Sequence, residues 1–329
     1  MNKKKKSKIA TRHRRVSRFW KKPHPYILLA LVALVSWLFT LPVRPPNLNA
    51  AATPPAAPTP HSPIFGTTVT AVPYCYGQAM DLYGPRVMKY ERSPVVMYIH
   101  GGGWYINTKS TEPDQLAMID GLRDRGFTVV SIDYRLLPKN HFPAPLEDSL
   151  CAVRYLRAHA DDYSLDSNRI AVYGFSAGGY LAGMVGVLDT NNDFTSESEP
   201  YHAFSSRVQA VVTLAGFFDL TNGLTVRNHQ RIHELLQDYP PSTTDPVHFT
   251  TPDDPPFLLI HGTDDGFVQL EQDELMSERL QAAGVHFERL LVQHAQHGLE
   301  SSGEPIEPAI QEVRQRVQDF IERFLFPYK

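Results

Sequence analysis

The chain has 329 residues and a net charge of −3, and its hydrophobic content of 42% is enough for a sizeable core. Eleven of the 32 basic residues and none of the 35 acidic ones lie in residues 1–25, so the rest of the chain carries a net charge of −14. This acidic body is a poor partner for nucleic acid, for an anionic membrane surface or for a strongly anionic substrate. Two cysteines are too few for a disulfide scaffold. The histidines lack the H-E-x-x-H spacing of a metallohydrolase.

The N-terminal part of the sequence predicts where the protein works. Residues 1–25 form a basic cytoplasmic segment, and the mostly apolar residues 26–41 follow it between two prolines. A helix of that length covers about 24 Å, which is short for a membrane core of about 30 Å, and the run is slightly long for the apolar region of a signal peptide. Because the basic flank stays inside, the rest of the chain is expected outside the cytoplasm. We expect a signal anchor in the membrane, or a secreted protein if the chain is cut near residues 50–52.

Two further segments complete the predicted domain organisation. Residues 42–63 are rich in proline and alanine and carry a single charge, which is typical of an extended linker. Residues 64–329 are long enough for one large domain of the α/β class. Strands alternate with helices along this domain, which predicts a doubly wound, mostly parallel sheet with helices on both faces.

One predicted strand, residues 95–100, leads directly into three glycines in the motif HGGGW at 100–104. Open α/β sheets bind ligands at the carboxyl ends of their strands, and a loop without side chains leaves backbone N–H groups accessible there. We assign the N–H groups of Gly102 and Gly103 to an oxyanion hole, which stabilises negative charge on a reacting carbonyl oxygen. A glycine turn without a catalytic role is the alternative. His100 is expected to orient the loop rather than to act as a base.

The two cysteines lie far apart in the sequence. Cys151 falls within an amphipathic helix predicted over residues 145–160, so we expect it to be a small core residue. A disulfide bond between Cys75 and Cys151 is the alternative, since the predicted export would expose the chain to an oxidising compartment.

Residues 168–173 are predicted to form a strand and residues 177–188 a helix of small residues, and the turn between them fits the G-x-S-x-G nucleophile elbow. In this motif a serine lies on a tight turn, and the glycines leave the room that the turn needs. We assign Ser176 as a nucleophile. The first N–H groups of the helix point toward it, and that of Ala177 completes the predicted oxyanion hole.

The chain after the next predicted strand, residues 208–214, lacks a regular pattern from residue 217 to residue 254. Connections of this length are often lids or binding elements, and the aromatic residues and histidines here suit a pocket wall. We expect a short lid-like insertion after the sixth strand, with an ordinary packed excursion as the alternative.

A serine nucleophile needs a base and an acid that orients the base, in the chain order Ser, Asp/Glu, His. A predicted strand at 255–261 leads to Asp264 and Asp265, and another at 285–292 leads to His294 and His297. We assign Asp265 and His297 to the triad, with Asp264 and His294 as the local alternatives. Asp219, which follows the strand at 208–214, is a weaker rival acid. A final amphipathic helix is predicted over residues 306–326.

Taken together, these motifs resemble an α/β-hydrolase-fold carboxylesterase of the hormone-sensitive-lipase-like group and of the bacterial acetyl- and feruloyl-esterase-like enzymes. The resemblance covers about residues 80–300 and implies the same triad and oxyanion donors as above. It implies only a structural turn for residues 133–135, and it is weakest near the acid, where the family often has a small residue and a proline. The motifs that carry it are HGGGW, DYRL at 133–136, FPAPLED at 142–148, GFSAGG at 174–179, PPFLLIHGTDD at 255–265 and QHG at 296–298.

The predicted reaction is hydrolysis of a carboxylic ester, most simply one with a short acyl chain. His297 would accept the Ser176 proton while Asp265 holds the imidazole, and an acyl-enzyme would follow. This chemistry needs no cofactor and no metal, and its partner is a small-molecule ester. The alternatives are a serine peptidase or amidase of the same fold, and a binding module without catalysis. The natural substrate and the oligomeric state do not follow from the sequence.

Overall fold

The computed structural model describes residues 64–326 except residues 111, 190, 191, 193, 196, 197 and 223. The predicted basic segment, apolar segment and linker, which together cover residues 1–63, lie outside the described residues. Among the residues that are described, we find no helix with the length and apolar character needed to cross a membrane.

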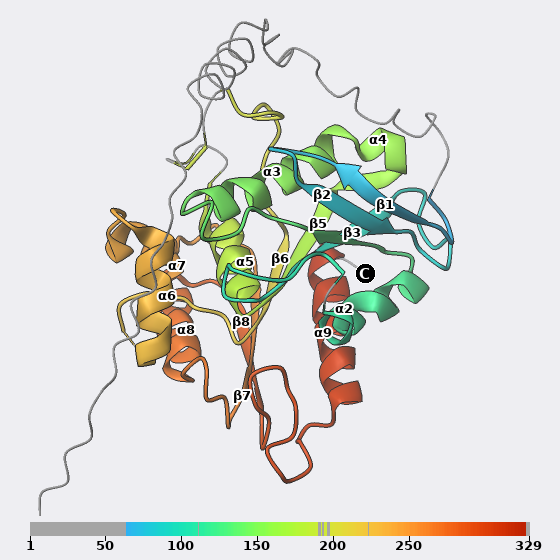
Figure 1. Ribbon diagram of the computed structural model, residues 1–329. Coiled ribbons are helices and arrows are strands. Elements are labelled where there is room, and N and C mark those ends of the chain that lie inside the picture. Colours follow the sequence, from blue (N-terminus) through green and yellow to red (C-terminus); the bar gives the residue numbers. More distant parts are fainter. Residues whose placement is uncertain are drawn as a thin grey trace, which may run out of the picture. The chain divides into compact units, whose positions relative to one another are not determined.

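The core of the domain is an eight-stranded sheet in the order β1-β2-β4-β3-β5-β6-β7-β8 (Figure 1). The β1–β2 and β2–β4 pairs are antiparallel, and the pairs from β4 to β8 are parallel. The predicted mostly parallel sheet is therefore confirmed. The strands are β1 (Thr68–Pro73), β2 (Ala79–Tyr83), β3 (Ser93–Ile99), β4 (Thr128–Ile132), β5 (Leu165–Phe175), β6 (Ala210–Leu214), β7 (Phe257–Gly262) and β8 (Phe287–Val292).

Helices cover both faces of the sheet. The central strands β3 and β6 are therefore buried along their whole length. In β3, Val95, Met97 and Ile99 belong to one apolar core, and Val96 and Tyr98 belong to the other. The first core includes α3 and α5, and the second includes α2 and α9, which lie together in Figure 1. The helices are α2 (Pro113–Asp120), α3 (Ala144–Ala158), α4 (Ala160–Tyr163), α5 (Ala177–Val187), α6 (Val226–Leu236), α7 (Pro246–Phe249), α8 (Glu271–Ala283) and α9 (Ile310–Leu325), with 3-10 turns at Gly121–Arg125 and Pro241–Thr243.

The connection between β6 and β7 differs from the irregular segment that the sequence predicted. It contains α6, α7 and a 3-10 turn between them. In α6, the residues Asn228, Ile232, Leu235 and Leu236 are buried, at the spacing of one helix face. The side chain of Thr225 caps its first turn by accepting the N–H of Asn228. That this segment acts as a lid stays a prediction.

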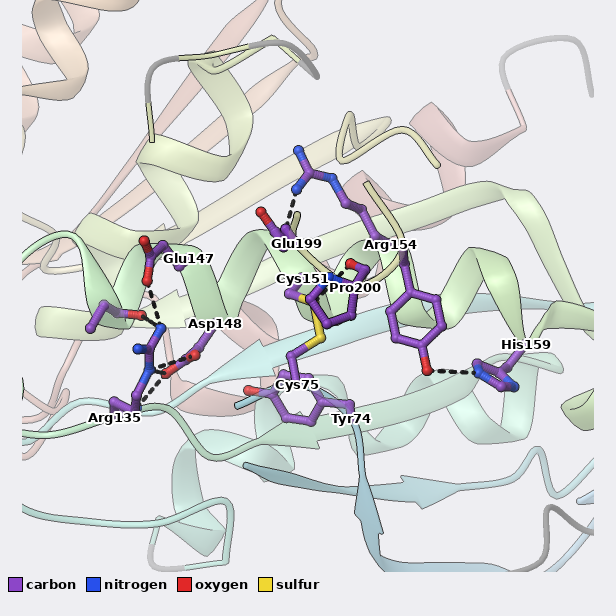
Figure 2. The surroundings of a disulfide bond; sticks show 12 residues. Tyr74, Cys75, Arg135, Glu147, Asp148, Cys151, Arg154, His159, Glu199 and Pro200 are labelled. Atoms are coloured by element: carbon purple, nitrogen blue, oxygen red, sulfur yellow. Dashed lines mark hydrogen bonds and ion pairs between the residues drawn. A yellow bond between two sulfur atoms is a disulfide. The ribbon is translucent and has the colours of Figure 1, made fainter. Parts of the chain in front are cut away.

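A disulfide bond joins Cys75, in the loop between β1 and β2, to Cys151 in α3 (Figure 2). Their Cα atoms are 6.3 Å apart, although the residues are separated by 76 positions in the sequence. Cys151 is fully buried, as expected, but it is paired, so the disulfide kept as the alternative is the one that the structure contains. Sequence alone could not show that the β1–β2 loop lies against α3. The bond fastens the antiparallel edge of the sheet to helix α3. Removal of such a bond typically costs a small domain about 2–5 kcal/mol of stability.

Candidate active site

Ser176 lies at the turn between β5 and α5, with backbone angles that are rare outside glycine (φ 55°, ψ −117°). Its N–H donates to the carbonyl oxygen of Leu214 at the end of β6, over 2.9 Å. A Cβ atom on Gly174 would lie 2.1 Å from the carbonyl oxygen of Gly178, and one on Gly178 would lie 2.1 Å from that of Ile99. The glycines are therefore required for space. Together they allow the strained elbow that presents Ser176 at the carboxyl end of β5.

Three side chains from different strand ends meet at this turn. Nε2 of His297 lies 2.9 Å from Oγ of Ser176, and Nδ1 of His297 lies 2.8 Å from Oδ2 of Asp265. Asp265 follows β7, and His297 belongs to the loop after β8. The rings of Phe175 and Phe267 flank the imidazole, with centroids 5.0 and 5.3 Å from its own. The structure thus brings together the three residues that the sequence assigned to the triad.

The alternative acids and histidine lie in other surroundings. Asp264 is exposed and accepts a hydrogen bond from the hydroxyl of Ser302. His294 is also on the surface, with 42% of its side chain exposed. Asp219 closes a turn of its own, where it accepts backbone N–H groups from the residues that follow it. Of the described contacts, none joins these three side chains to Ser176 or His297.

A second histidine lies behind Asp265. Nε2 of His261 is 3.2 Å from Oδ2 of Asp265, and Nδ1 is 3.1 Å from Oδ1 of Asp273 in α8. Burial lowers the pKa of an imidazole, but these two carboxylates overcome it and raise the pKa of His261 to about 10. Burial also opposes ionisation of Asp265, yet hydrogen bonds from His261 and His297 hold its pKa well below the usual range. A protonated His261 therefore keeps Asp265 ionised and facing His297.

The glycine loop borders the same cavity as the triad. Gly102 and Gly103 line a cavity of about 200 Å³ together with Ser176 and His297. Both glycines have positive φ angles, 103° and 61°. Ala177 is the first residue of α5, so its N–H has no acceptor within the helix. The three predicted oxyanion donors thus belong to the two backbone segments that adjoin the Ser176 side chain.

The carboxylate of Glu112 holds the glycine loop in place. Its Oε2 accepts the N–H of Gly101 over 2.9 Å and also the hydroxyl of Tyr98. Its Oε1 accepts the side-chain amide of Asn107 over 2.8 Å. Sequence reasoning missed Glu112, because it follows the HGGGW motif in a loop that carries no pattern of its own.

Residues of the DYRL motif also contact the glycine loop and the segment that follows it. The hydroxyl of Tyr134 donates to the carbonyl oxygen of His100 over 2.9 Å, and the two rings stack with centroids 4.2 Å apart. Nδ1 of His100 lies 2.8 Å from the carbonyl oxygen of Gly101. Oδ1 of Asp133 accepts the backbone N–H of Lys109 over 2.8 Å. The structure therefore places the His100 side chain among contacts that orient the loop, and none of the described contacts joins it to a triad side chain.

Helix α6 supplies polar lining that the sequence did not predict. Arg227, Asn228 and Arg231 all border the cavity that contains Ser176. The side-chain amide of Asn228 donates to the carbonyl oxygen of Phe267, which attaches α6 to the loop after β7. The sequence signal that could have predicted this helix is the spacing of residues 228, 232, 235 and 236, which share one helix face. The polar residues between them made this spacing hard to recognise.

A larger cavity of about 670 Å³ borders the end of α5 and the segment from Tyr239 to Thr251. It contains none of the predicted site residues. Among the described residues, no group of three or more His, Cys, Asp or Glu side chains is placed to hold a metal ion. The reactive groups therefore converge on the smaller cavity alone among the cavities described here.

Comparison with known protein families assigns the chain to one of them. The BD-FAE family model matches residues 80–280, which is more than half of the chain. The chain belongs to the BD-FAE family. The residues of this BD-FAE protein that match the model include the glycine loop, Ser176 and Asp265, whereas His297 lies beyond them.

Several sequence relatives of this BD-FAE protein are named as esterases. Esterase LipC of Mycobacterium tuberculosis is 30% identical to it over 215 residues, which cover 62% of this chain and 52% of LipC. The chain thus spans about half the length of the curated relatives it matches. The predicted resemblance to carboxylesterases is confirmed by this similarity.

Solved structures show the same fold. A bifunctional GH43-CE protein of Bacteroides eggerthii is 27% identical, with a TM-score of 0.66 over 78% of this chain and 35% of that one. The esterase Est2 of Thermogutta terrifontis is 25% identical, with a TM-score of 0.62 over 76% of this chain and 88% of that one. The predicted α/β-hydrolase fold is therefore confirmed.

Proposed function

We propose that this protein is a serine esterase that hydrolyses carboxylic esters through an acyl-enzyme. Ser176 attacks the ester carbonyl, His297 accepts its proton and later returns it to the leaving alcohol, and Asp265 orients the imidazole. The N–H groups of Gly102, Gly103 and Ala177 stabilise the tetrahedral intermediate. Water then repeats the sequence on the acyl-enzyme and releases the acid.

One observation carries this proposal. The hydrogen-bonded series from Ser176 to His297 to Asp265, at 2.9 and 2.8 Å, ends on a strained turn beside a glycine loop. A nucleophile, a base and an orienting acid at these distances form the constellation that acyl transfer needs. The ester hydrolases among the relatives, such as LipC, favour the ester over the amide as the substrate.

We assign short acyl chains as the preferred class of substrate. The cavity beside Ser176 holds about 200 Å³, which is less than the roughly 300–1,000 Å³ of common ligand pockets. Trp104 and Phe217 are buried against it and restrict the space for a long chain. One structural neighbour, 26% identical, is an acetyl ester-xyloside bifunctional hydrolase of Caldicellulosiruptor lactoaceticus, which is consistent with a small acyl group.

Hydrolysis of p-nitrophenyl esters from acetate to laurate by the full chain tests the proposal. We expect turnover that falls as the acyl chain lengthens and that Ser176→Ala lowers by about 10⁴-fold or more. Ser242→Ala is the matched control, because Ser242 is exposed and lines the larger cavity instead. Absence of turnover on every ester by folded protein would overturn the esterase and favour the peptidase, amidase or binding module of the same fold.

We further propose that the catalytic domain acts outside the cytoplasm, on a membrane anchor or as a secreted protein. The basic and apolar segments at residues 1–41 support export. The bond between Cys75 and Cys151 supports an oxidising compartment. In intact cells that express the full chain, protease added outside should digest the catalytic domain, and the two thiols should resist alkylation. A protected domain with alkylated thiols would contradict export.

A further inference from the structure

Two arginines of α6 stand at the cavity that contains the triad. Arg227 and Arg231 are four residues apart and therefore on the same side of the helix. Both line the cavity together with Ser176 and His297. The guanidinium of Arg227 lies 5.5 Å from the ring centroid of Phe267, which itself contacts the imidazole of His297.

Arg231 is closest to the glycine loop. A Cβ atom on Gly103 would lie 2.6 Å from its Nη1, so the guanidinium occupies the space that the glycine leaves free. Arg231 is partly buried, whereas Arg227 is exposed. One cation thus lies against the predicted oxyanion loop, and the other lies at the mouth of the same cavity.

Neither guanidinium has an ion-pair partner within 4.0 Å in the part of the chain that the structure describes. Glu112 is the sole acid among the described residues that line the cavity, and both of its oxygens already hold the glycine loop. Glu234 is the acid nearest in the helix, and it lies beside Tyr105: burial and Glu234 raise the pKa of Tyr105 to about 12, while Arg231 opposes the shift. The cavity lining therefore carries two guanidinium charges against the single carboxylate of Glu112, which is a net positive charge.

The local charge matters more than the charge of the whole body. Screening reduces interactions between charges that are more than about 8–10 Å apart at physiological salt. The −14 charge of the acidic body, spread over the domain, thus contributes less to the potential in the cavity than two cations on its wall. This reverses, for the cavity itself, the sequence-based expectation that anionic substrates are disfavoured.

We propose that Arg227 and Arg231 form an anion subsite that binds a carboxylate on the substrate, and that the natural substrates are esters carrying a carboxylate close to the ester bond. The proposal rests on the esterase function proposed above. Guanidinium groups match a carboxylate through two parallel hydrogen bonds. The cap at Thr225 and the bond from Asn228 to Phe267 hold the helix that carries the two arginines in place beside the cavity.

Matched pairs of esters that differ only in charge test this subsite on the full chain. For the alcohol half, 3-acetoxybenzoate is compared with 3-acetoxybenzamide. For the acyl half, the p-nitrophenyl monoester of glutaric acid is compared with its terminal amide. We expect kcat/KM to favour the carboxylate member of at least one pair by about tenfold or more, and the pair that shows the preference identifies the half of the ester that faces α6.

The variants Arg227→Gln, Arg231→Gln and the double change assign the preference to the two side chains. Each single change should lower the ratio of kcat/KM between carboxylate and amide by about threefold to tenfold, and the double change should abolish it. Arg279→Gln is the matched control, because Arg279 is exposed on α8, away from the cavity, and it should leave the ratio unchanged. Raising the salt concentration should weaken the preference of the wild-type chain.

The outcomes separate this proposal from the esterase assignment. Turnover of the neutral esters without a preference for either carboxylate overturns the subsite and leaves the esterase standing. The same holds for a preference that survives the double change. If no ester is turned over, binding of benzoate to the Ser176→Ala chain by calorimetry still decides the matter: loss of binding in the double arginine variant supports the subsite, and equal or absent binding overturns it.

Discussion

The two sides of the cavity are built in different ways. On one side, the elbow and the glycine loop present backbone groups that buried contacts hold, such as the bond from the Ser176 N–H to Leu214 and the bonds to Glu112. On the other side, α6 presents the long side chains of Arg227 and Arg231. Reaction chemistry needs positions held within about 0.5 Å, whereas substrate choice can vary with exposed side chains. In the function proposed above, different parts of the cavity wall thus carry out the reaction and select its substrate.

The largest loss of kcat among these variants should come from a change of the triad acid, Asp265. Asp265→Asn keeps the shape of the side chain but removes the charge that orients and stabilises the imidazole, so kcat should fall by about 10³–10⁴-fold. Asp264→Asn changes the adjacent exposed acid, which contacts Ser302 instead, and should leave kcat within about twofold. Steady-state kinetics on one short-chain ester measures both. Equal losses of kcat in the two variants would contradict the assignment of Asp265, rather than Asp264, as the triad acid.

A smaller effect is expected at the support of the glycine loop. Glu112→Gln replaces one of the two acceptor oxygens by an NH2 donor, so the groups of Gly101, Tyr98 and Asn107 can no longer all be satisfied. The loop should then shift by a fraction of an ångström, which lowers kcat by about 10–100-fold. Because Glu112 acts through the loop, KM should change much less than kcat. Asp114→Asn, an exposed change two residues further on, is the control. A rise in KM with an unchanged kcat would contradict the positioning role.

The smallest effect concerns how stability depends on pH. The pKa of His261 is raised to about 10 from an ordinary value of about 6.5, so its stabilising contribution is complete below about pH 6.5 and is lost as the pH rises through about 10. The groups that face it are the carboxylates of Asp265 and Asp273 and the carbonyl oxygen of Val268.

Denaturant unfolding at pH 7, 8.5 and 10 measures this contribution. The wild-type free energy of unfolding should fall over this range by up to about 1.4 kcal/mol per pH unit from this group. The fall should be shallower in His261→Gln. His286→Gln, a change of an exposed histidine, should keep the wild-type slope. Identical slopes in wild type and His261→Gln would show that His261 is not held protonated.

What the sequence could predict follows the same division between backbone and side chains. The elbow, the glycine loop and the parallel strands leave short local patterns, because glycines and apolar runs are required at fixed positions. The structure then placed Ser176, Asp265 and His297 together as the strand order demands. Boundaries shifted by a few residues, as in β5, which begins at Leu165 rather than at residue 168.

The remaining features depend on contacts between distant segments. Glu112 and His261 act through partners that only the folded chain brings near, Gly101 in one case and Asp273 in the other. The disulfide likewise needs the β1–β2 loop to lie on α3. Helix α6 was missed although its apolar residues keep a helical spacing, because most of its residues are polar and it lies inside a long connection between strands. Its arginines therefore could not be assigned to the site from the sequence.

Reaction of the full chain with a fluorophosphonate, followed by peptide mass spectrometry, tests the central claim most directly. The reagent modifies serines that a neighbouring base has activated. Stoichiometric modification of Ser176, slowed by a short-chain ester and absent from the His297→Gln chain, is the result that this account predicts. Modification of another serine in folded protein, or none at all, would contradict it.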